Sequence, residues 1–523
     1  MGLVDWGIVI VYLAVLVGMS FFIGSRQKDQ DDYYLGGRTI RPWQLGVSMA
    51  ANQVSAISLV GVPAFIAVKR GGGLVWLQYE MAIPLAMIVI IVLLVPLFRA
   101  TGSVSIYRYL EDRFGRGTRL CMSMVFLVSR SLAAGVALLA TAYVTSACAG
   151  LGLFESIALI GLVSLLYTSV GGIRADIYSD ILQLALLWMS SFVVIGLLVW
   201  GRGFPDFTLA DPSRLRIFDL SAAGLGRGNT FSFWPMIIGG FFLYISYYGC
   251  DQSQAQRLLS AETDRGAQRS LVINSLVRFP LVITYSIVGL LLIDFLARNE
   301  PFAAEVMSGP PDMLMPAFFV RFVPSGLLGL MVAGIFAASM SSLDSTINSL
   351  SAATWEDFLV RLRPSWAAMA DRKKIWVSRF ITLVWGLFAV SFALMMAGRS
   401  ETVVELVNKI GSAFYGPIAG VFVMGIAVKN AGQPAALAGL VAGVASNILF
   451  WIFFSSQVSW MWWNCTGFAV TMGCGLLLSL KKSPARAEAS LKAAPAVPRA
   501  YVAAMLVWFG LILLFCLGLE KML

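Results

Sequence analysis

Long apolar runs recur along the whole chain and limit what it can fold into. Of its 523 residues, 59% are hydrophobic and only 13% are charged. A helix that crosses a bilayer needs about 20 predominantly apolar residues, and about fourteen segments of the chain meet this requirement. We therefore predict an all-α polytopic membrane protein with a single transmembrane domain, 1–523. The expected spans are residues 5–24, 43–67, 72–98, 118–150, 154–172, 179–200, 232–252, 270–297, 325–355, 375–398, 401–428, 432–456, 459–479 and 500–519.

Basic residues predict how these spans are oriented. Arg26, Lys28, Arg38 and Arg41 follow the first span, and Arg257, Arg265 and Arg269 are expected on the same side. Loops rich in Lys and Arg stay in the cytoplasm, so the N-terminus is expected outside, in a bacterial-type cytoplasmic (inner) membrane. The first span begins after Asp5 and lacks a small-residue cleavage site, so we predict a helix there and no signal peptide.

Charge and cysteine content argue against several other kinds of protein. The net charge of +10 follows from the loop asymmetry, and no basic stripe interleaved with aromatic residues indicates a nucleic-acid surface. Six cysteines are scattered without metal-ligand spacing, as expected of small buried hydrophobic residues. We find no nucleophile and base pair, no metal triad and no phosphate-binding loop, so an enzyme is not expected. No obligate protein partner is evident either.

One apolar segment carries an unusual concentration of oxygen atoms. Residues 338–346 read Ala-Ser-Met-Ser-Ser-Leu-Asp-Ser-Thr. Polar groups inside a membrane helix are tolerated mainly where they face a partner, a cavity or an ion, and hard cations prefer oxygen ligands. We therefore predict Ser341, Ser342, Asp344 and Ser345 as cation ligands. The alternative is close packing of helices through small residues.

Two spans are interrupted near the middle of the membrane. The first break lies in residues 51–58, before Gly61 and Pro63, and the second lies in residues 247–252. Each falls in the first helix of one half if 43–200 and 232–428 are two five-helix repeats, which is typical of inverted-repeat secondary transporters. A kinked pair of structural helices is the alternative. In the transporter, free carbonyls at the first break would face the serine-rich segment and close one cation site.

Several segments together resemble the sodium:solute symporter family, whose members share the ten-helix inverted-repeat core of the amino-acid transporter LeuT. The matching segments are 32–38, 51–63, 167–173, 178–180, 251–257 and 417–422. The resemblance implies a LeuT-like 5+5 inverted repeat with one extra N-terminal helix, 5–24, and about three extra C-terminal helices, 432–519. It also implies sodium-coupled symport by alternating access.

The resemblance further implies two cation sites. The family's shared sodium site falls on Ala338, Ser341 and Ser342, with backbone oxygens from Ala51 and Val54. Some members bind a second sodium ion at an aspartate that corresponds to Asp180. Here Asp344 and Ser345 would join Asp180 and Ser341 in that site. Because two nearby carboxylates repel, both sodium and a proton remain open as the ion of the second site. Na+ is the only cofactor expected.

Polar residues on the segments that line the solute cavity in relatives are the candidate substrate ligands. They are Ser55, Ser58, Gln78, Glu80, Arg130, Tyr247, Asp251, Gln252 and Arg278. Arg130 resembles the arginine that binds the substrate carboxylate in sialic acid transporters. A structural ion pair of Arg130 with Glu80 or Asp251 is the alternative, and Arg278 has the same ambiguity.

The expected solute is a small organic anion, such as a carboxylate or sialic acid, because Arg130 and Arg278 both lie inside the membrane. A sodium-coupled sugar or polyol symporter is the main alternative. A transporter-like solute sensor is an alternative of another class. A channel is disfavoured because the polar residues are clustered and do not form a continuous lining.

Overall fold

The structure is a computed structural model that describes the chain except for residues 55, 201–205, 208–210, 227–229, 398–402 and 481–497. The side chains of residues 56, 57 and 403–408 are also outside the description. In the described part, helices account for the regular structure, and β pairing is limited to two isolated bridges.

The α-helices follow in chain order. They are α1 (Leu3–Gly24), α2 (Gln30–Leu35), α3 (Pro42–Gln53), α4 (Ala56–Ala67), α5 (Leu77–Glu80), α6 (Ala82–Val89), α7 (Val95–Thr101), α8 (Tyr107–Phe114), α9 (Arg116–Ala149), α10 (Leu153–Val199), α11 (Pro212–Leu215), α12 (Gly240–Tyr244), α13 (Gln252–Leu259), α14 (Asp264–Arg298), α15 (Glu300–Met307), α16 (Leu314–Phe322), α17 (Leu327–Ala353), α18 (Val360–Leu362), α19 (Asp371–Met396), α20 (Val403–Ala427), α21 (Gln433–Phe454), α22 (Trp460–Ser479) and α23 (Arg499–Met522). Short 3₁₀ and π-helical turns join some of them: η1 (Gly36–Arg38), η2 (Leu74–Trp76), η3 (Ile90–Leu94), η4 (Pro235–Gly239), η5 (Ile245–Cys250), η6 (Pro311–Met313), η7 (Thr354–Leu359) and η8 (Pro364–Ala368).

Every expected span falls on helical structure. Within the described residues, ten helices are long and apolar enough to cross a membrane, and a bent pair, Pro42–Gln53 with Ser58–Ala67, makes an eleventh. Pro235–Cys250 is a shorter apolar helix. The expected spans 154–172 and 179–200 are the two parts of α10, which bends at Gly172.

Both predicted helix breaks are present. Helix α3 ends at Gln53, Val54 has the extended angles φ −87° and ψ 94°, and the axis turns by 55° before the chain continues as α4. In the second half of the chain, η5 ends at Cys250, and Asp251 is extended at φ −93° and ψ 127° before α13 begins. A helix end leaves up to four carbonyl or N–H groups without intrahelical partners, so both breaks expose backbone polar groups inside the protein.

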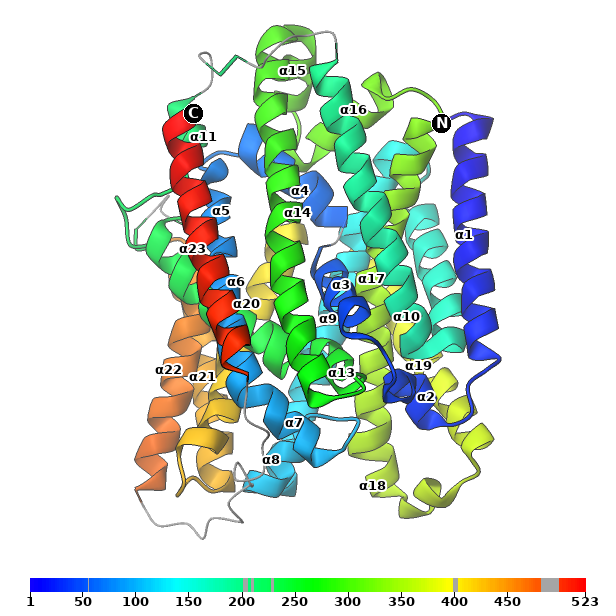
Figure 1. Ribbon diagram of the computed structural model, residues 1–523, viewed down its shortest axis with the longest axis vertical. Helices are drawn as coiled ribbons and strands as arrows, with labels where there is room; N and C mark the ends of the chain where they lie inside the picture. Colours follow the sequence, from blue (N-terminus) through cyan, green and yellow to red (C-terminus); the bar gives the residue numbers. More distant parts are fainter. Residues whose placement is uncertain (55, 201–205, 208–210, 227–229, 398–402, 481–497) are drawn as a thin grey trace.

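Helices α17 and α9 lie in the interior of the bundle, and α10 packs against α17 and α1 (Figure 1). Helix α17 packs against α9, α10 and α1, while α14 packs against both halves of the first broken helix. Helices α20, α21 and α22 pack on one another at one edge. The two broken helices therefore meet α17, α9 and α14 in the interior.

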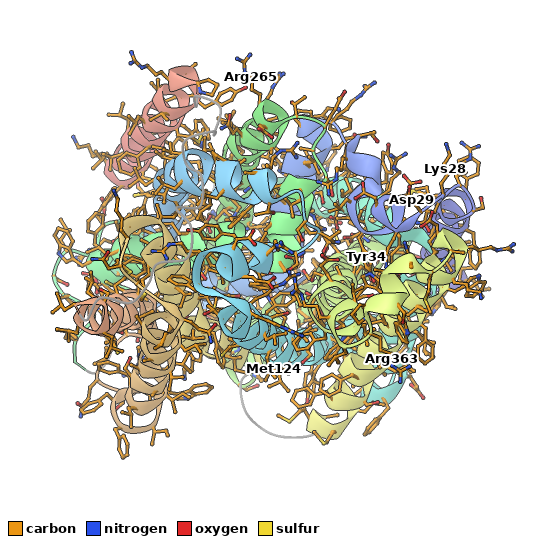
Figure 2. All side chains as sticks on the ribbon, turned by 90° about the horizontal axis from the view of Figure 1, so that it is seen from below. Lys28, Asp29, Tyr34, Met124, Arg265 and Arg363 are labelled. Carbon is orange, nitrogen blue, oxygen red and sulfur yellow. The ribbon has the colours of Figure 1, made fainter. Side chains whose placement is uncertain are left out.

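The two chain ends lie at the same end of the molecule, which also carries α11, α15 and α16 (Figure 1). Helices α2, α8 and α18 lie at the opposite end. Figure 2 views that opposite end and shows Lys28 and Arg265 pointing outward from its rim. The basic connections are thus collected at the end remote from both termini.

The connection 298–324 is more structured than the sequence predicts. It contains α15 and α16, and Asn299 caps α15 by accepting a hydrogen bond from the backbone N–H of Phe302 at 3.3 Å. Phe302 packs edge-to-face on Phe295 and Phe322. These helices are too short to produce a spanning signal in the sequence, and aromatic packing on the end of α14 holds them in place.

Candidate functional site

A cavity of about 290 Å³ lies between the two broken helices. Its lining comes from both breaks and from α9, α14, α17 and α20. The polar and aromatic residues that line it are Asn52, Gln53, Ser58, Phe65, Lys69, Trp76, Tyr79, Arg130, Phe231, Tyr247, Ser253, Arg278, Asp312, Ser342, Thr346, Tyr415 and Trp460. Of the predicted substrate residues, the cavity thus brings together Ser58, Arg130, Tyr247 and Arg278.

Arg130 of α9 reaches the second break. Its Nε donates to the Asp251 carboxylate, and its guanidinium lies over the rings of Tyr247 and Tyr415, 5.0 and 5.6 Å from their centroids. Its Nη2 has no hydrogen-bond partner among the described residues. The aromatic rings hold the guanidinium by cation–π attraction and leave one donor group unused.

Arg278 of α14 forms the second ion pair, with Glu80 at the end of α5. Its Nε and Nη2 donate to the two carboxylate oxygens of Glu80, each at 3.0 Å. This bidentate geometry is the strong form of an arginine–carboxylate pair. Its Nη1 has no partner in the described part of the chain. The two arginines therefore pair as Arg130–Asp251 and Arg278–Glu80.

The carboxylates of these pairs do not line the cavity. Arg130 and Arg278 line it, whereas Asp251 and Glu80 do not. Lys69, partly exposed, also lines it, and its ammonium lies 5.7 Å from the Phe65 ring and 5.9 Å from the Phe231 ring. Asp312 is the one carboxylate among the described lining residues. Burial raises the pKa of Asp312, while the nearby Lys69 amine acts to lower it.

Two other predicted substrate residues, Gln78 and Gln252, have different surroundings. The Gln78 amide donates to the backbone oxygen of Phe231 at 3.3 Å and accepts from the Asp219 N–H at 3.1 Å. Gln252 donates to the Val104 carbonyl at 2.7 Å and accepts from the Ile106 N–H at 3.0 Å. Neither side chain lines the cavity, and both link helix ends to neighbouring loops. Ser55 lies outside the described residues.

Of the residues predicted for the first sodium site, Ser342 contacts the first break directly. Ser342 of α17 donates to the backbone carbonyl of Asn52 at 3.0 Å. Ala51 and Val54, on either side of that carbonyl in sequence, are buried, and α17 packs on α3 and α4. Ala338, Ser341 and Ser342 share one face of α17 because positions three and four residues apart are neighbours on a helix. Helix-end carbonyls and hydroxyls are thus close together here.

Asp180 is the centre of a buried network that the sequence predicted only in part. It accepts hydrogen bonds from Ser341 and from Ser48 at 2.5 Å, and Nη2 of Arg257 lies 2.8 Å from it. The same Nη2 lies 2.9 Å from Asp176. All of these side chains are nearly inaccessible to solvent.

Arg257, Asp176 and Ser48 are members of this network that the sequence analysis did not identify. The sequence groups Arg257 with the loop residues Arg265 and Arg269, but the structure places its side chain, 1% exposed and ion-paired, in the protein interior. Asp176 lies one helical turn before Asp180, so the spacing of the two carboxylates was a usable signal.

Two of the three α17 residues predicted for the second site, Asp344 and Ser345, face different neighbours. Ser345 donates to Asp176 at 3.1 Å and accepts from Arg257, so it joins the Asp180 network. Asp344 does not. Both of its carboxylate oxygens are buried without a hydrogen-bond partner among the described residues.

Known proteins share the sequence pattern and the fold of this chain. A sequence model of the sodium:solute symporter family matches residues 33–443, which is most of the chain. The chain belongs to the sodium:solute symporter family. It is therefore an integral, multi-pass membrane protein that couples the symport of a small solute to Na+.

Individual members of the family are similar in sequence to most of this chain. The human sodium/iodide cotransporter is 28% identical over 452 residues, covering 85% of this chain and 69% of that protein. Human sodium-coupled monocarboxylate transporter 1 is 29% identical over 457 residues, covering 85% and 72%.

Solved structures show the same fold. A sodium-coupled sialic acid symporter, in a substrate-bound outward-open state with a novel sodium site, superposes with a TM-score of 0.81 at 24% identity, covering 92% of this chain and 99% of that chain. A nucleobase-cation-symport-1 family transporter superposes with a TM-score of 0.53 at 13% identity, covering 87% and 96%. The predicted LeuT-like fold class is confirmed.

Proposed function

We propose that this symporter transports a small organic anion with a carboxylate group. The observation that carries the proposal is the pair of unused donor groups, Nη2 of Arg130 and Nη1 of Arg278, on two guanidinium groups that line one cavity. Arginine recognises carboxylates through such paired donors. A carboxylate that accepts from both would satisfy two buried donor groups at once.

The charged residues that line the cavity favour the binding of an anionic solute. Arg130, Arg278 and Lys69 line it, and Asp312 is the opposing carboxylate among its described lining residues. Glu80 and Asp251 balance the charge of the two arginines without lining the cavity themselves. The names of the similar human proteins also indicate anions, iodide in one case and monocarboxylates in the other.

Sodium would bind where the first break meets α17. Backbone oxygens of Ala51, Val54 and Ala338, with the hydroxyls of Ser341 and Ser342, supply a ligand set made only of oxygen, which suits a hard cation. Binding there ties the first broken helix, which carries the cavity residue Ser58, to α17. Sodium on this site would therefore hold the cavity in the form that accepts solute, and alternating access would release both on the other side.

The proposal is tested by thermal unfolding of the purified full-length protein with panels of monocarboxylates, sialic acids, sugars and polyols, in sodium and in potassium. A ligand that binds the folded state raises the unfolding temperature by mass action. We expect a sodium-dependent rise with a carboxylate, and its loss in the double variant Arg130→Gln/Asp251→Asn. This variant removes the guanidinium without leaving a buried unpaired charge.

Arg38→Gln is the matched control, because Arg38 is a partly exposed arginine outside the cavity. Arg38→Gln should show the same sodium-dependent rise in unfolding temperature as the wild type. A sodium-dependent rise with a neutral sugar that survives in the double variant would overturn the anion proposal and favour the sugar symporter.

A further inference from the structure

A groove of about 430 Å³ lies on the outer face of the bundle, and it shares no described lining residue with the solute cavity. Its walls are the last residues of α1, the first half of α10 and the first turns of α19. Phe21, Trp376 and Phe380 line it, and each of them is more than half exposed. Because these three helices are long and apolar enough to span the membrane, the groove opens toward lipid.

The mouth of the groove lies at the depth where spanning helices end. Gly24 is the last residue of α1, and Val170 lies two residues before the bend of α10 at Gly172. Both residues line the groove, together with Trp376 from the second turn of α19. Tryptophan is enriched where a membrane meets water. The mouth is therefore expected at the level of the lipid headgroups.

The groove is charged at its mouth and apolar below it. Arg379 is the charged residue among its described lining residues. Leu383 lies four residues after Arg379 in α19, about 6 Å further into the membrane at the rise of an α-helix, and it also lines the groove. Phe21 lies about one turn inward from the end of α1. A charged head above an apolar chain is the profile of a phospholipid.

Arg379 has donor capacity and charge that its protein neighbours do not use up. Its Nη2 donates to the carbonyl oxygens of Gly24 at 3.0 Å and Val170 at 3.2 Å, and to the side-chain oxygen of Gln27 at 3.1 Å. These acceptors are all neutral, so none of them compensates the positive charge. Its Nε has no hydrogen-bond partner among the described residues, and its guanidinium lies 5.6 Å from the ring centroid of Trp376. Such a guanidinium is suited to bind a phosphate group.

The chain segments that adjoin the mouth are basic. Residues 24–29 and 371–379 together contain six basic and two acidic side chains. Both acidic side chains have local partners, because Asp29 accepts from the Asp32 N–H at 2.8 Å and Asp371 pairs with Lys374 at 3.4 Å. Figure 2 shows Lys28 pointing outward from the rim of this end. The excess positive charge favours an anionic headgroup.

We propose that this groove binds an anionic phospholipid, with its phosphate on Arg379 and an acyl chain along Phe21, Phe380 and Leu383. Basic pockets between membrane helices are typical binding places for anionic headgroups. The lipid would supply the negative charge that the neutral partners of Arg379 lack, and it would connect the end of α1 with α19. This site goes beyond the proposed function and depends neither on the solute nor on sodium.

Thermal unfolding of the purified, delipidated full-length protein in detergent tests the proposal without any solute. The probes are dioleoyl phosphatidylglycerol, dioleoyl phosphatidylcholine with the same acyl chains, and inorganic phosphate. A ligand of the folded state raises the unfolding temperature by mass action, and we expect this rise with phosphatidylglycerol alone. Arg379→Gln should weaken the apparent affinity for phosphatidylglycerol at least about fivefold, the usual effect of one basic residue on binding to anionic lipid.

Arg214→Gln is the matched control for this variant. Arg214 is likewise a partly exposed arginine that donates to three backbone carbonyl oxygens at a helix end, those of Ile66, Val68 and Lys69. It does not line the groove, and it belongs to α11 at the opposite end of the molecule. Arg214→Gln should therefore bind phosphatidylglycerol as the wild type does, even if its unfolding temperature without lipid is lower.

Ser25→Asp tests the mouth without changing Arg379. Ser25 lines the groove and is exposed, and its hydroxyl donates to the Phe22 carbonyl at 2.9 Å. A carboxylate there would repel the headgroup and weaken phosphatidylglycerol binding. Ser308→Asp is the matched control, because Ser308 is also exposed at a helix end and donates to the carbonyl three residues earlier, that of Glu305, at 2.7 Å. Ser308→Asp should keep the wild-type affinity.

Three results would overturn the proposal. An equal rise with phosphatidylcholine would show that the groove takes acyl chains without recognising a headgroup, and a rise with inorganic phosphate would indicate a site for a free anion. Unchanged phosphatidylglycerol affinity in both Arg379→Gln and Ser25→Asp would place the lipid elsewhere. Size-exclusion chromatography establishes that each variant is folded, and Ser25→Asp carries the test if Arg379→Gln is not. Failure of the anion proposal would leave these outcomes unaffected.

Discussion

At the residue scale, Asp251 has two roles. Its carboxylate caps α13 by accepting from the Ser253 N–H at 2.9 Å, and it pairs with Arg130. Asparagine caps a helix about as well as aspartate, but it carries no charge. The substitution Asp251→Asn therefore separates the two roles.

We expect Asp251→Asn to lower the free energy of unfolding by about 3–5 kcal/mol, the usual cost of removing one partner of a buried ion pair. We also expect an anionic solute to raise its unfolding temperature more than that of the wild type, because the solute replaces the missing charge. Asp29→Asn is the control, since Asp29 caps α2 and no arginine pairs with it in the described part of the chain. A smaller response to the anion in Asp251→Asn would contradict this account.

The sequence predicted which arginines line the cavity more reliably than it predicted their ion pairs. Arg130 and Arg278 stand out because arginine within a membrane span is rare. The sequence also offers Glu80 and Asp251 as ion-pair partners, but which carboxylate pairs with which arginine depends on side-chain rotamers and on the meeting of distant helices, which a single sequence does not reveal. Arg257 was missed for a related reason, since its sequence neighbours Arg265 and Arg269 are typical of a loop.

At the element scale, the bend in α10 depends on one glycine. Gly172 has φ 60° and ψ −165°, a region that is essentially open only to glycine. A Cβ atom there would lie 2.5 Å from the Tyr33 carbonyl oxygen. This bend sets the positions of Asp176, Asp180 and Gln183 relative to the first half of the helix.

We expect Gly172→Ala to lower the free energy of unfolding by at least about 2 kcal/mol, from backbone strain and the added steric contact. Gly196→Ala in the same helix is the matched control, because a Cβ there meets nothing within 4 Å. Alanine is a better helix former than glycine by roughly 0.5–1 kcal/mol, so the control should be neutral or stabilised. Unfolding in mild detergent measures both, and equal stability of the two variants would contradict the role of the bend.

The spanning helices were predictable because the bilayer requires long apolar runs. Both helix breaks were also visible, since polar residues, glycine and proline interrupt those runs. The short helices α15 and α16 were not predicted, because tertiary packing on α14 stabilises them. The predicted division between the spans 154–172 and 179–200 agrees with the kink at Gly172, where paired glycines indicate a break.

At the scale of the whole molecule, the two ends of the bundle differ in charge. The end remote from the termini carries the basic connections and an ion-pair network in which Arg119 and Arg361 both bind Glu111. Burial of Glu111 alone would raise its pKa, but these guanidinium groups lower it overall. The assignment of residues 43–200 and 232–428 as inverted repeats stays a prediction.

We predict that the basic end faces the cytoplasm. Single cysteines placed by Gly309→Cys and Arg363→Cys would lie at exposed positions of opposite ends. A membrane-impermeant thiol reagent on intact cells should label the first and should reach the second only after permeabilisation, with the unsubstituted protein as the background. The reverse pattern would contradict the predicted orientation.

The internal pairing of the cavity arginines bears on how membrane voltage acts on transport. Because Asp251 and Glu80 balance Arg130 and Arg278, the solute site adds almost no charge of its own to the moving protein. One sodium ion with a monovalent anion would then cross without net charge. With two sodium ions, one positive charge would cross in each cycle, and a potential of 100 mV would contribute about 2.3 kcal/mol. With the arginines paired, any sodium ion beyond the first is the component that connects uptake of a monovalent anion to the membrane potential.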